Sequence, residues 1–143
     1  MNIIMKHLFR SLAFASVFAL TGVFTLAAEP ALVGNKGLTG QTLDADTIKA
    51  VLLGKKATLG DARVVIVIVK GSEGQEAFLK DHVGMSTDQF NTYWRRLFMT
   101  GGGSAPKNAD SDEEAGKFLA STPGAIAIID SAKADGLAVL ATK

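Results

Sequence analysis

Hydrophobic and polar positions form blocks along the chain that predict strands and helices in alternation. The run RVVIVIVK, residues 63–70, holds six consecutive β-branched residues between charged ends. Such an uninterrupted apolar run is typical of a strand buried on both faces, as in the centre of a sheet covered by helices. The segments AIAIID (125–130) and GLAVLA (136–141) predict two more strands, and residues 31–33 predict a short first strand.

Four segments between these strands have the period of an amphipathic helix. The first begins at Asp44 or Asp46, either of which can cap a helix N-terminus, and ends at Gly54. The fourth spans about residues 110–120. The three acidic residues near its start, 112–114, suit the positive end of a helix dipole.

The second and third helices begin with capping-box patterns. Ser72 is followed three residues later by Gln75, and Ser86 is followed by Gln89. In the third helix the apolar stripe consists of Phe90, Tyr93, Trp94 and Leu97. Helical spacing favours core packing for its aromatic side chains, Phe98 included, over the stacking of a ligand. The alternation of helices and apolar strands predicts an α/β domain with helices on both faces of a small sheet.

The N-terminal segment has the pattern of a secretory signal peptide. Lys6 and Arg10 precede an uncharged run of 16 residues, 11–26, and small residues lead to a cleavage site after Ala27 or Ala28. The run is shorter than the roughly 20 residues of a membrane span, so cleavage is favoured over a retained anchor. We therefore expect residues 1–28 to be a cleaved signal peptide and residues 29–143 to form one domain in the periplasm.

Composition narrows the classes of function. Without Lys6 and Arg10 the chain has 13 basic and 14 acidic side chains, so it lacks the basic excess that attracts nucleic acid. It contains no cysteine, so packing alone must stabilise an exported domain. His82 is the one histidine after residue 28, which leaves no zinc ligand set and predicts no metal or cofactor. We expect Asp81 and His82 to be a solvated pair on the surface. No catalytic residues are predicted, so the protein is not expected to be an enzyme.

One turn has the features of an anion site. The segment VKGSEGQEAF follows a strand and opens a helix, so that backbone N–H groups and the helix dipole at Gly71, Ser72, Glu73 and Gly74 favour an anion. Lys70 supplies a nearby cation. The plain alternative is that Ser72 only caps its own helix. The run GGGS, which ends at Ser104, follows a helix instead, so it fits neither phosphate-loop motif.

Several motifs in order resemble the phosphate-type substrate-binding proteins of bacterial ABC transporters. These motifs are a helix ending in Leu-Gly-Lys (53–55), G-S-x-x-x-x-A-F (71–78), Trp94 in the next helix, and T-P-G-A-I (122–126). The resemblance covers about residues 40–130. It is strongest to short, single-lobe members, and it implies a periplasmic-binding-protein-like lobe with a small mixed sheet.

The resemblance also implies an oxyanion site at the turn after the central strand. The family places an Arg at the strand end and Ser-Gly-Thr at the helix start. In this chain Ser72 matches the Ser, Glu73 and Gly74 replace the Gly and Thr, and Lys70 is the nearest cation to the missing Arg. A carboxylate at Glu73 repels an anion, and lysine does not replace a bidentate arginine. We therefore expect weak or no phosphate binding, with Ser104 as a minor candidate because the family's corresponding loop lies near the cleft.

Two functions remain open. The first is binding of phosphate or another small oxyanion alongside an ABC permease, in which a homodimer could imitate the missing second lobe. The second is a ligand-free interaction or adaptor module of the cell envelope that retains the fold.

Overall fold

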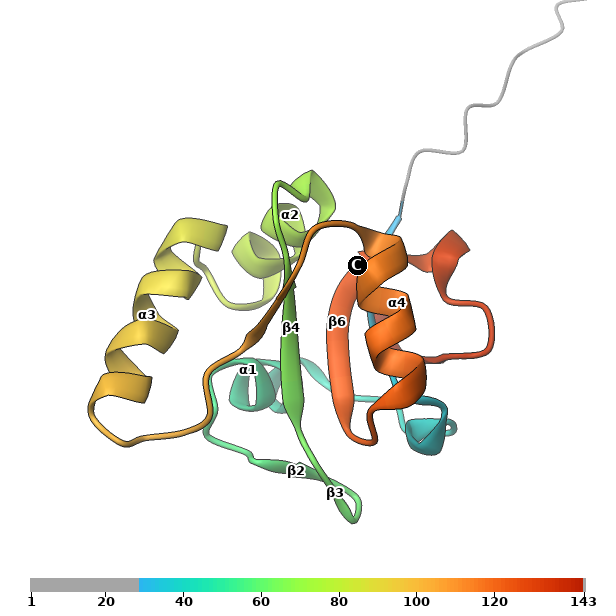
Figure 1. The fold of residues 1–143 in the computed structure, drawn as a ribbon, viewed down its shortest axis with the longest axis horizontal. Coiled ribbons are helices and arrows are strands. Elements are labelled where there is room, and N and C mark those ends of the chain that lie inside the picture. Colours follow the sequence, from blue (N-terminus) through green and yellow to red (C-terminus); the bar gives the residue numbers. More distant parts are fainter. Residues whose placement is uncertain (1–28, 143) are drawn as a thin grey trace, which may run out of the picture.

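A five-stranded mixed sheet forms the centre of the molecule (Figure 1). The computed structural model describes residues 29–142. The strand order is β5-β4-β6-β1-β7, in which β4 runs parallel to β5 and β6, and β1 runs antiparallel to β6 and β7. The strands are β1 (Pro30–Gly34), β4 (Val65–Val69), β5 (Lys107–Ala109), β6 (Ala125–Asp130) and β7 (Ala138–Thr142).

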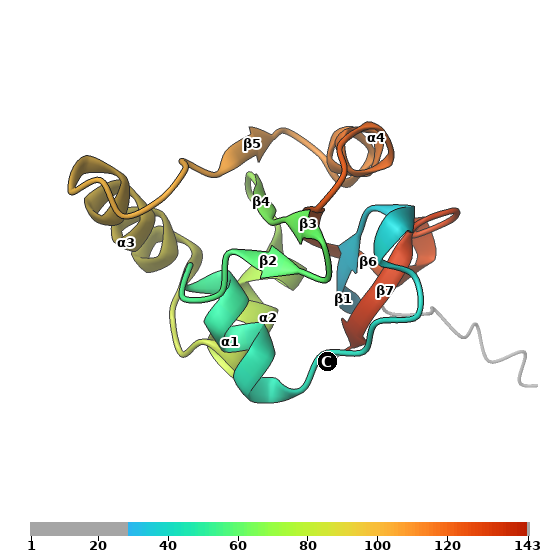
Figure 2. The ribbon, with the colours of Figure 1, turned by 90° about the horizontal axis from the view of Figure 1, so that it is seen from below.

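Helices cover both faces of this sheet, as the sequence predicted. They are α1 (Ala45–Leu52), α2 (Glu73–His82), α3 (Thr87–Met99) and α4 (Asp112–Ser121). Figure 2 shows α4 on the opposite side of the sheet from α1 and α2. A small hairpin of β2 (Thr58–Leu59) and β3 (Ala62–Arg63) precedes β4, and two 3₁₀ turns, η1 (Lys36–Leu38) and η2 (Ser131–Lys133), follow β1 and β6. The structure therefore has the predicted α/β class, a small mixed sheet with helices on both faces.

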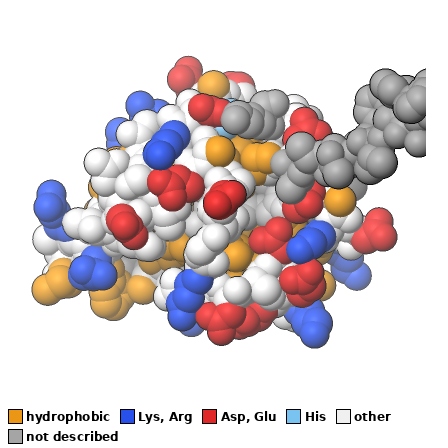
Figure 3. All heavy atoms as spheres, turned by 90° about the horizontal axis from the view of Figure 1, so that it is seen from above, with side chains coloured by type: hydrophobic (Ala, Val, Ile, Leu, Met, Phe, Trp, Pro, Cys, Tyr) orange, Lys and Arg blue, Asp and Glu red, His pale blue; other side chains and the backbone are white. Residues whose placement is uncertain are grey.

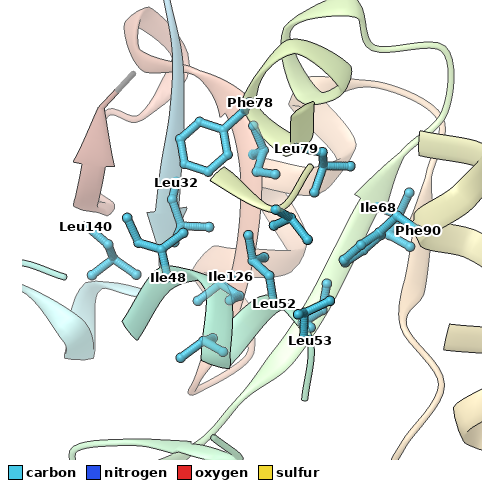
Figure 4. Close-up of a cluster of buried hydrophobic side chains, with 14 of the residues drawn as sticks. Leu32, Ile48, Leu52, Leu53, Ile68, Phe78, Leu79, Phe90, Ile126 and Leu140 are labelled. Carbon is cyan, nitrogen blue, oxygen red and sulfur yellow. The ribbon is translucent and has the colours of Figure 1, made fainter. Parts of the chain in front are cut away.

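The two faces of the sheet have separate hydrophobic cores. The larger core joins one face of the strands to α1, α2 and α3, and Figure 4 shows Leu52 of α1, Phe78 of α2 and Phe90 of α3 within it. The smaller core packs the other face against Ala115 and Leu119 of α4. Residues 66–69 of β4 are buried and contribute alternately to both cores, which confirms the strand predicted to be covered on both faces.

Gln75 completes the central strand where its neighbour diverges. The last β4–β6 pair is Val67–Ala127, yet the peptide groups of Val69 are buried beyond it. The side-chain amide of Gln75, itself only 2% exposed, accepts from the Val69 N–H at 2.8 Å and donates to the Val69 carbonyl at 3.0 Å. This one side chain therefore takes the place of a strand partner.

This role corrects the capping prediction for α2. Ser72 caps the helix, because its hydroxyl accepts from the N–H of Gln75, but the Gln75 side chain turns inward to Val69 instead of back to Ser72. A buried, unpaired peptide costs more than an exposed helix end, so the amide goes to the strand. In α3 the full capping box of Ser86 and Gln89 forms as predicted.

Three other expectations differ from the structure. The strand predicted over residues 63–70 is divided at Val64 into β3 and β4. The segment Lys107–Ala109, for which no strand was predicted, forms β5, because pairing with β4 stabilises it despite its polar residues. Phe98, expected in the core, is 53% exposed near the end of α3.

The predicted signal peptide lies outside the described residues. Among residues 29–142, no helix is long and apolar enough to cross a membrane.

We predict that Gln75→Leu lowers the free energy of unfolding by about 2 kcal/mol or more, because an unsatisfied buried peptide group costs roughly 1–3 kcal/mol. Leucine has a similar size, so the change mainly removes the two hydrogen bonds to Val69. Urea denaturation followed by circular dichroism measures the change.

The matched control is Gln89→Leu, which removes an exposed capping contact to Ser86 and should cost no more than about 1 kcal/mol. Equal losses for the two variants would contradict the strand-completing role of Gln75.

Candidate functional site

The turn between β4 and α2 holds five of the six predicted ligand residues, Lys70 to Gly74. Gly71 has φ +65°, a conformation that favours glycine. Ser72 caps α2, with its hydroxyl 3.1 Å from the N–H of Gln75 that it accepts. The N–H groups of Glu73 and Gly74 donate to no acceptor within residues 29–142. They lie at the positive end of the helix dipole, so an anion is favoured there.

The chain's own groups occupy much of the space around this turn. The Nζ of Lys70 lies 3.3 Å from the Oδ1 of Asp110, which follows β5, so the predicted cation already has a carboxylate partner. A Cβ added at Gly74 would lie 3.3 Å from the Cβ of Pro30, which shows that the start of β1 packs close to the start of α2. Gln75 pairs with Val69 past the last β4–β6 pair, and the core void that Gln75 lines with residues of β4 and β6 measures only about 10 Å³. That is about the space of one water molecule.

Carboxylates take the backbone N–H groups at this end of the sheet. Asp112 accepts from the N–H of Asp130 at 3.1 Å, and Glu114 accepts from the N–H of Asp110 at 3.0 Å. Figure 3 looks onto the end of the sheet where β4 and β6 finish and shows acidic side chains spread across it, with basic ones between them. At the turn itself, a bound anion would meet the carboxylates of Glu73 and Asp110.

The two residues of one exposed ion pair at the start of α4 have shifted pKa values. The Nζ of Lys133 lies 2.9 Å from the Oε1 of Glu113, and this hydrogen bond lowers the pKa of Glu113 and raises that of Lys133. Because the pKa of Glu113 is depressed by folding, its contribution to stability is present above the unfolded pKa and is lost as the pH falls through the folded pKa. The pair is exposed, so salt screens it and it contributes little.

Ser104 lies in a different place from the other five predicted residues. It lines a pocket of about 540 Å³ together with residues at the start of β4, whereas Lys70 to Gly74 follow the end of that strand. Val65 and Lys70 are five residues apart, or about 16 Å along an extended strand. The structure therefore brings Lys70, Gly71, Ser72, Glu73 and Gly74 together and separates Ser104 from them.

The pocket at Ser104 has apolar walls and a cationic rim that the sequence reading missed. Its lining is Val51, Gly54, Lys56, Ala57, Arg63, Val64, Val65, Ile66, Trp94, Gly102, Gly103, Ser104 and Ala105. The only sign of this rim in the sequence was that Lys56 and Arg63 stand on either side of a short segment, residues 57–62. Folding brings them to one rim because the β2–β3 hairpin turns the chain back.

Trp94 is held firmly in the wall of this pocket. Its indole N–H donates to the carbonyl of Leu52 at 3.0 Å, and the hydroxyl of the neighbouring Tyr93 donates to the carbonyl of Leu53 at 2.6 Å. Gly54 has φ +74°, and a Cβ there would lie 2.7 Å from the Trp94 ring, so the end of α1 contacts the indole directly. The aromatic wall is thus pre-organised.

His82 has a packing role, and metal ligands are not grouped in the described range. The His82 ring lies 4.1 Å from that of Phe78, centroid to centroid, in the same helix. Residues 29–142 contain no group of three or more His, Cys, Asp or Glu side chains that could hold a metal ion.

Comparisons with known proteins give a likeness of fold. No protein-family model matches the chain, and no curated protein matches it. Among solved structures it is similar to a phosphate ABC transporter substrate-binding protein from Clostridium perfringens with bound phosphate, at a TM-score of 0.59 and 17% sequence identity. The match covers 78% of this chain and 44% of that chain. The chain therefore shares the fold of part of a substrate-binding protein and spans less than half of that protein's length.

Proposed function

We propose that the protein is a periplasmic solute-binding-like protein of the phosphate or oxyanion ABC transporter type, which contacts a small oxyanion weakly. The observation that carries this proposal is the turn from Lys70 to Gly74. It opens α2 at the carboxyl end of a central parallel strand, which is where α/β sheets commonly bind ligands, and it presents unpaired N–H groups. The similar Clostridium perfringens structure was solved with bound phosphate, which supports an oxyanion as the ligand class.

Three features of the turn argue for low affinity. Glu73 places a carboxylate in the first turn of α2, and Asp110 pairs with Lys70. Gln75 takes both backbone hydrogen-bonding groups of Val69, so the Val69 N–H cannot donate to an anion. An anion at this turn therefore remains in water, where charge pairing is weak.

The role that follows is binding and not catalysis. A single lobe leaves one side of the turn open, so a second copy of the chain or an ABC permease is the partner that would cover it. Export by residues 1–28 would place the protein in the periplasm beside such a permease.

A second candidate is an interaction or adaptor module of the cell envelope that keeps the fold without a ligand. Phe98 and Met99, at the end of α3, favour it because they are 53% and 78% exposed. Side chains of this size commonly contribute to protein interfaces. Specific co-purification with one membrane complex, lost on Met99→Glu, would support this module over the solute-binding role.

Isothermal titration of the purified protein with inorganic phosphate tests the first proposal. We expect binding weaker than micromolar, because Glu73 lies in the turn and the cation Lys70 is already paired with Asp110. Asp110→Asn and Glu73→Gln should each tighten binding severalfold by removing a negative charge. Asp61→Asn, in the exposed turn between β2 and β3, is the matched control and should leave it unchanged. Micromolar or tighter binding by the unchanged protein would refute the weak-binding proposal.

We also predict that Ser72→Ala lowers the free energy of unfolding by about 1 kcal/mol, because Ser72 caps α2 through the N–H of Gln75. Ser104→Ala, at an exposed loop position, should stay within about 0.5 kcal/mol of the unchanged protein. Urea denaturation measures both variants, and an equal effect of the two would show that the Ser72 hydroxyl does not act as a cap.

A further inference from the structure

The pocket beside Trp94 has the dimensions and lining of a small-molecule site. Its volume of about 540 Å³ falls within the range of roughly 300–1,000 Å³ that is usual for ligand pockets. We propose that it binds a small organic anion with an apolar or aromatic body, such as an aryl carboxylate or sulfonate. This inference concerns the opposite end of β4 from Ser72 and is independent of the function proposed above.

The charge around the pocket favours an anion. Lys56 and Arg63 lie on its rim, and neither forms a salt bridge in the part of the chain that the structure describes. No Asp or Glu is among its lining residues. A planar guanidinium at Arg63 can bind a carboxylate or sulfonate through two parallel hydrogen bonds. Because both cations are exposed, the anionic group of the ligand lies at the mouth and stays partly hydrated.

The walls select for an apolar body behind that charge. Val65 contributes aliphatic surface, and the exposed parts of Ile66 and Trp94, which are 8% and 6% exposed, add an aliphatic and an aromatic patch. Burying such surface stabilises a complex by about 25 cal/mol per Å², which an inorganic ion does not gain. Phosphate alone therefore leaves most of this pocket unused, whereas an aryl or branched acyl group fills it.

The loop after α3 lines one side of the pocket, and its close packing there requires glycines. Gly102 donates to the carbonyl of Leu97 at 2.8 Å, and a Cβ on Gly102 would clash with the Leu97 side chain. A Cβ on Gly103 would lie 3.4 Å from the Trp94 ring. The loop therefore lies flat against α3 and the indole, and it brings the exposed Ser104 to the pocket, where its hydroxyl is a hydrogen-bond donor for the anionic group.

Fluorescence titration of the full-length protein with anilinonaphthalene sulfonate tests the proposal. This probe joins an aromatic body to one sulfonate, and Trp94 is the only tryptophan in the chain. Binding in the pocket should quench Trp94 by energy transfer to the probe, in a saturable one-to-one manner. Phenylnaphthylamine, the uncharged analogue, should bind more weakly because it has no group for Lys56 and Arg63.

Charge-reversal variants locate the bound probe. The double variant Lys56→Glu, Arg63→Glu should weaken binding about tenfold or more, because attraction at the rim becomes repulsion. The control is Lys49→Glu, Lys117→Glu, which changes the net charge equally at exposed positions outside the pocket and should change affinity less than about twofold. Circular dichroism of each variant confirms that it is folded.

Three outcomes would overturn the inference. They are equal probe affinity for the two double variants, equal or tighter binding of the uncharged analogue, and probe binding without quenching of Trp94.

Discussion

Completion of the central strand β4 is the constraint on which the rest of the structure depends. This strand joins the two parallel pairings of the sheet and contributes to the cores on both faces. Its last residue, Val69, extends past the end of its pairing with β6, and a buried peptide group cannot remain unpaired at low cost. Gln75 satisfies that peptide from the first turns of α2, so the start of the helix is fixed against the strand.

This solution affects where a ligand can bind. In open α/β sheets the crevice at the carboxyl ends of the strands is the usual binding place. Here the Gln75 amide occupies the backbone groups of Val69 past the last β4–β6 pair, and Lys70 pairs with Asp110. A pocket of about 540 Å³ lies instead at the amino end of β4, between α1, α3 and the loop at residues 102–105. One lobe thus combines a carboxyl edge whose Val69 backbone and Lys70 cation are already paired with a pocket at the opposite edge.

The two ends also differ in charge. At the carboxyl edge, Asp112 and Glu114 accept backbone N–H groups of the chain itself. At the amino edge, Lys56 and Arg63 lie on the rim of an apolar pocket without a carboxylate in its lining. Although the charges of the chain are nearly balanced, the carboxyl edge of the sheet is therefore less favourable to an anion than the amino edge. Net charge alone describes neither edge, because only local fields and desolvation decide binding.

The sequence by itself determined the elements whose signals are local. The β-branched run at 64–69, the capping box of Ser86 and Gln89, and the Ser72 cap depend on residues near one another in the chain, and the α/β class with helices on both faces followed from their alternation. Only the tertiary structure decided which strands pair, that β5 forms, that Phe98 is exposed, and that Ser104 lies away from Ser72. It also decided that Gln75 hydrogen-bonds to Val69 and that Lys56 and Arg63 lie on the rim of the same pocket. These outcomes depend on contacts between residues distant in sequence or on competition for a buried peptide group. The secondary-structure propensity of a short segment reflects neither of these.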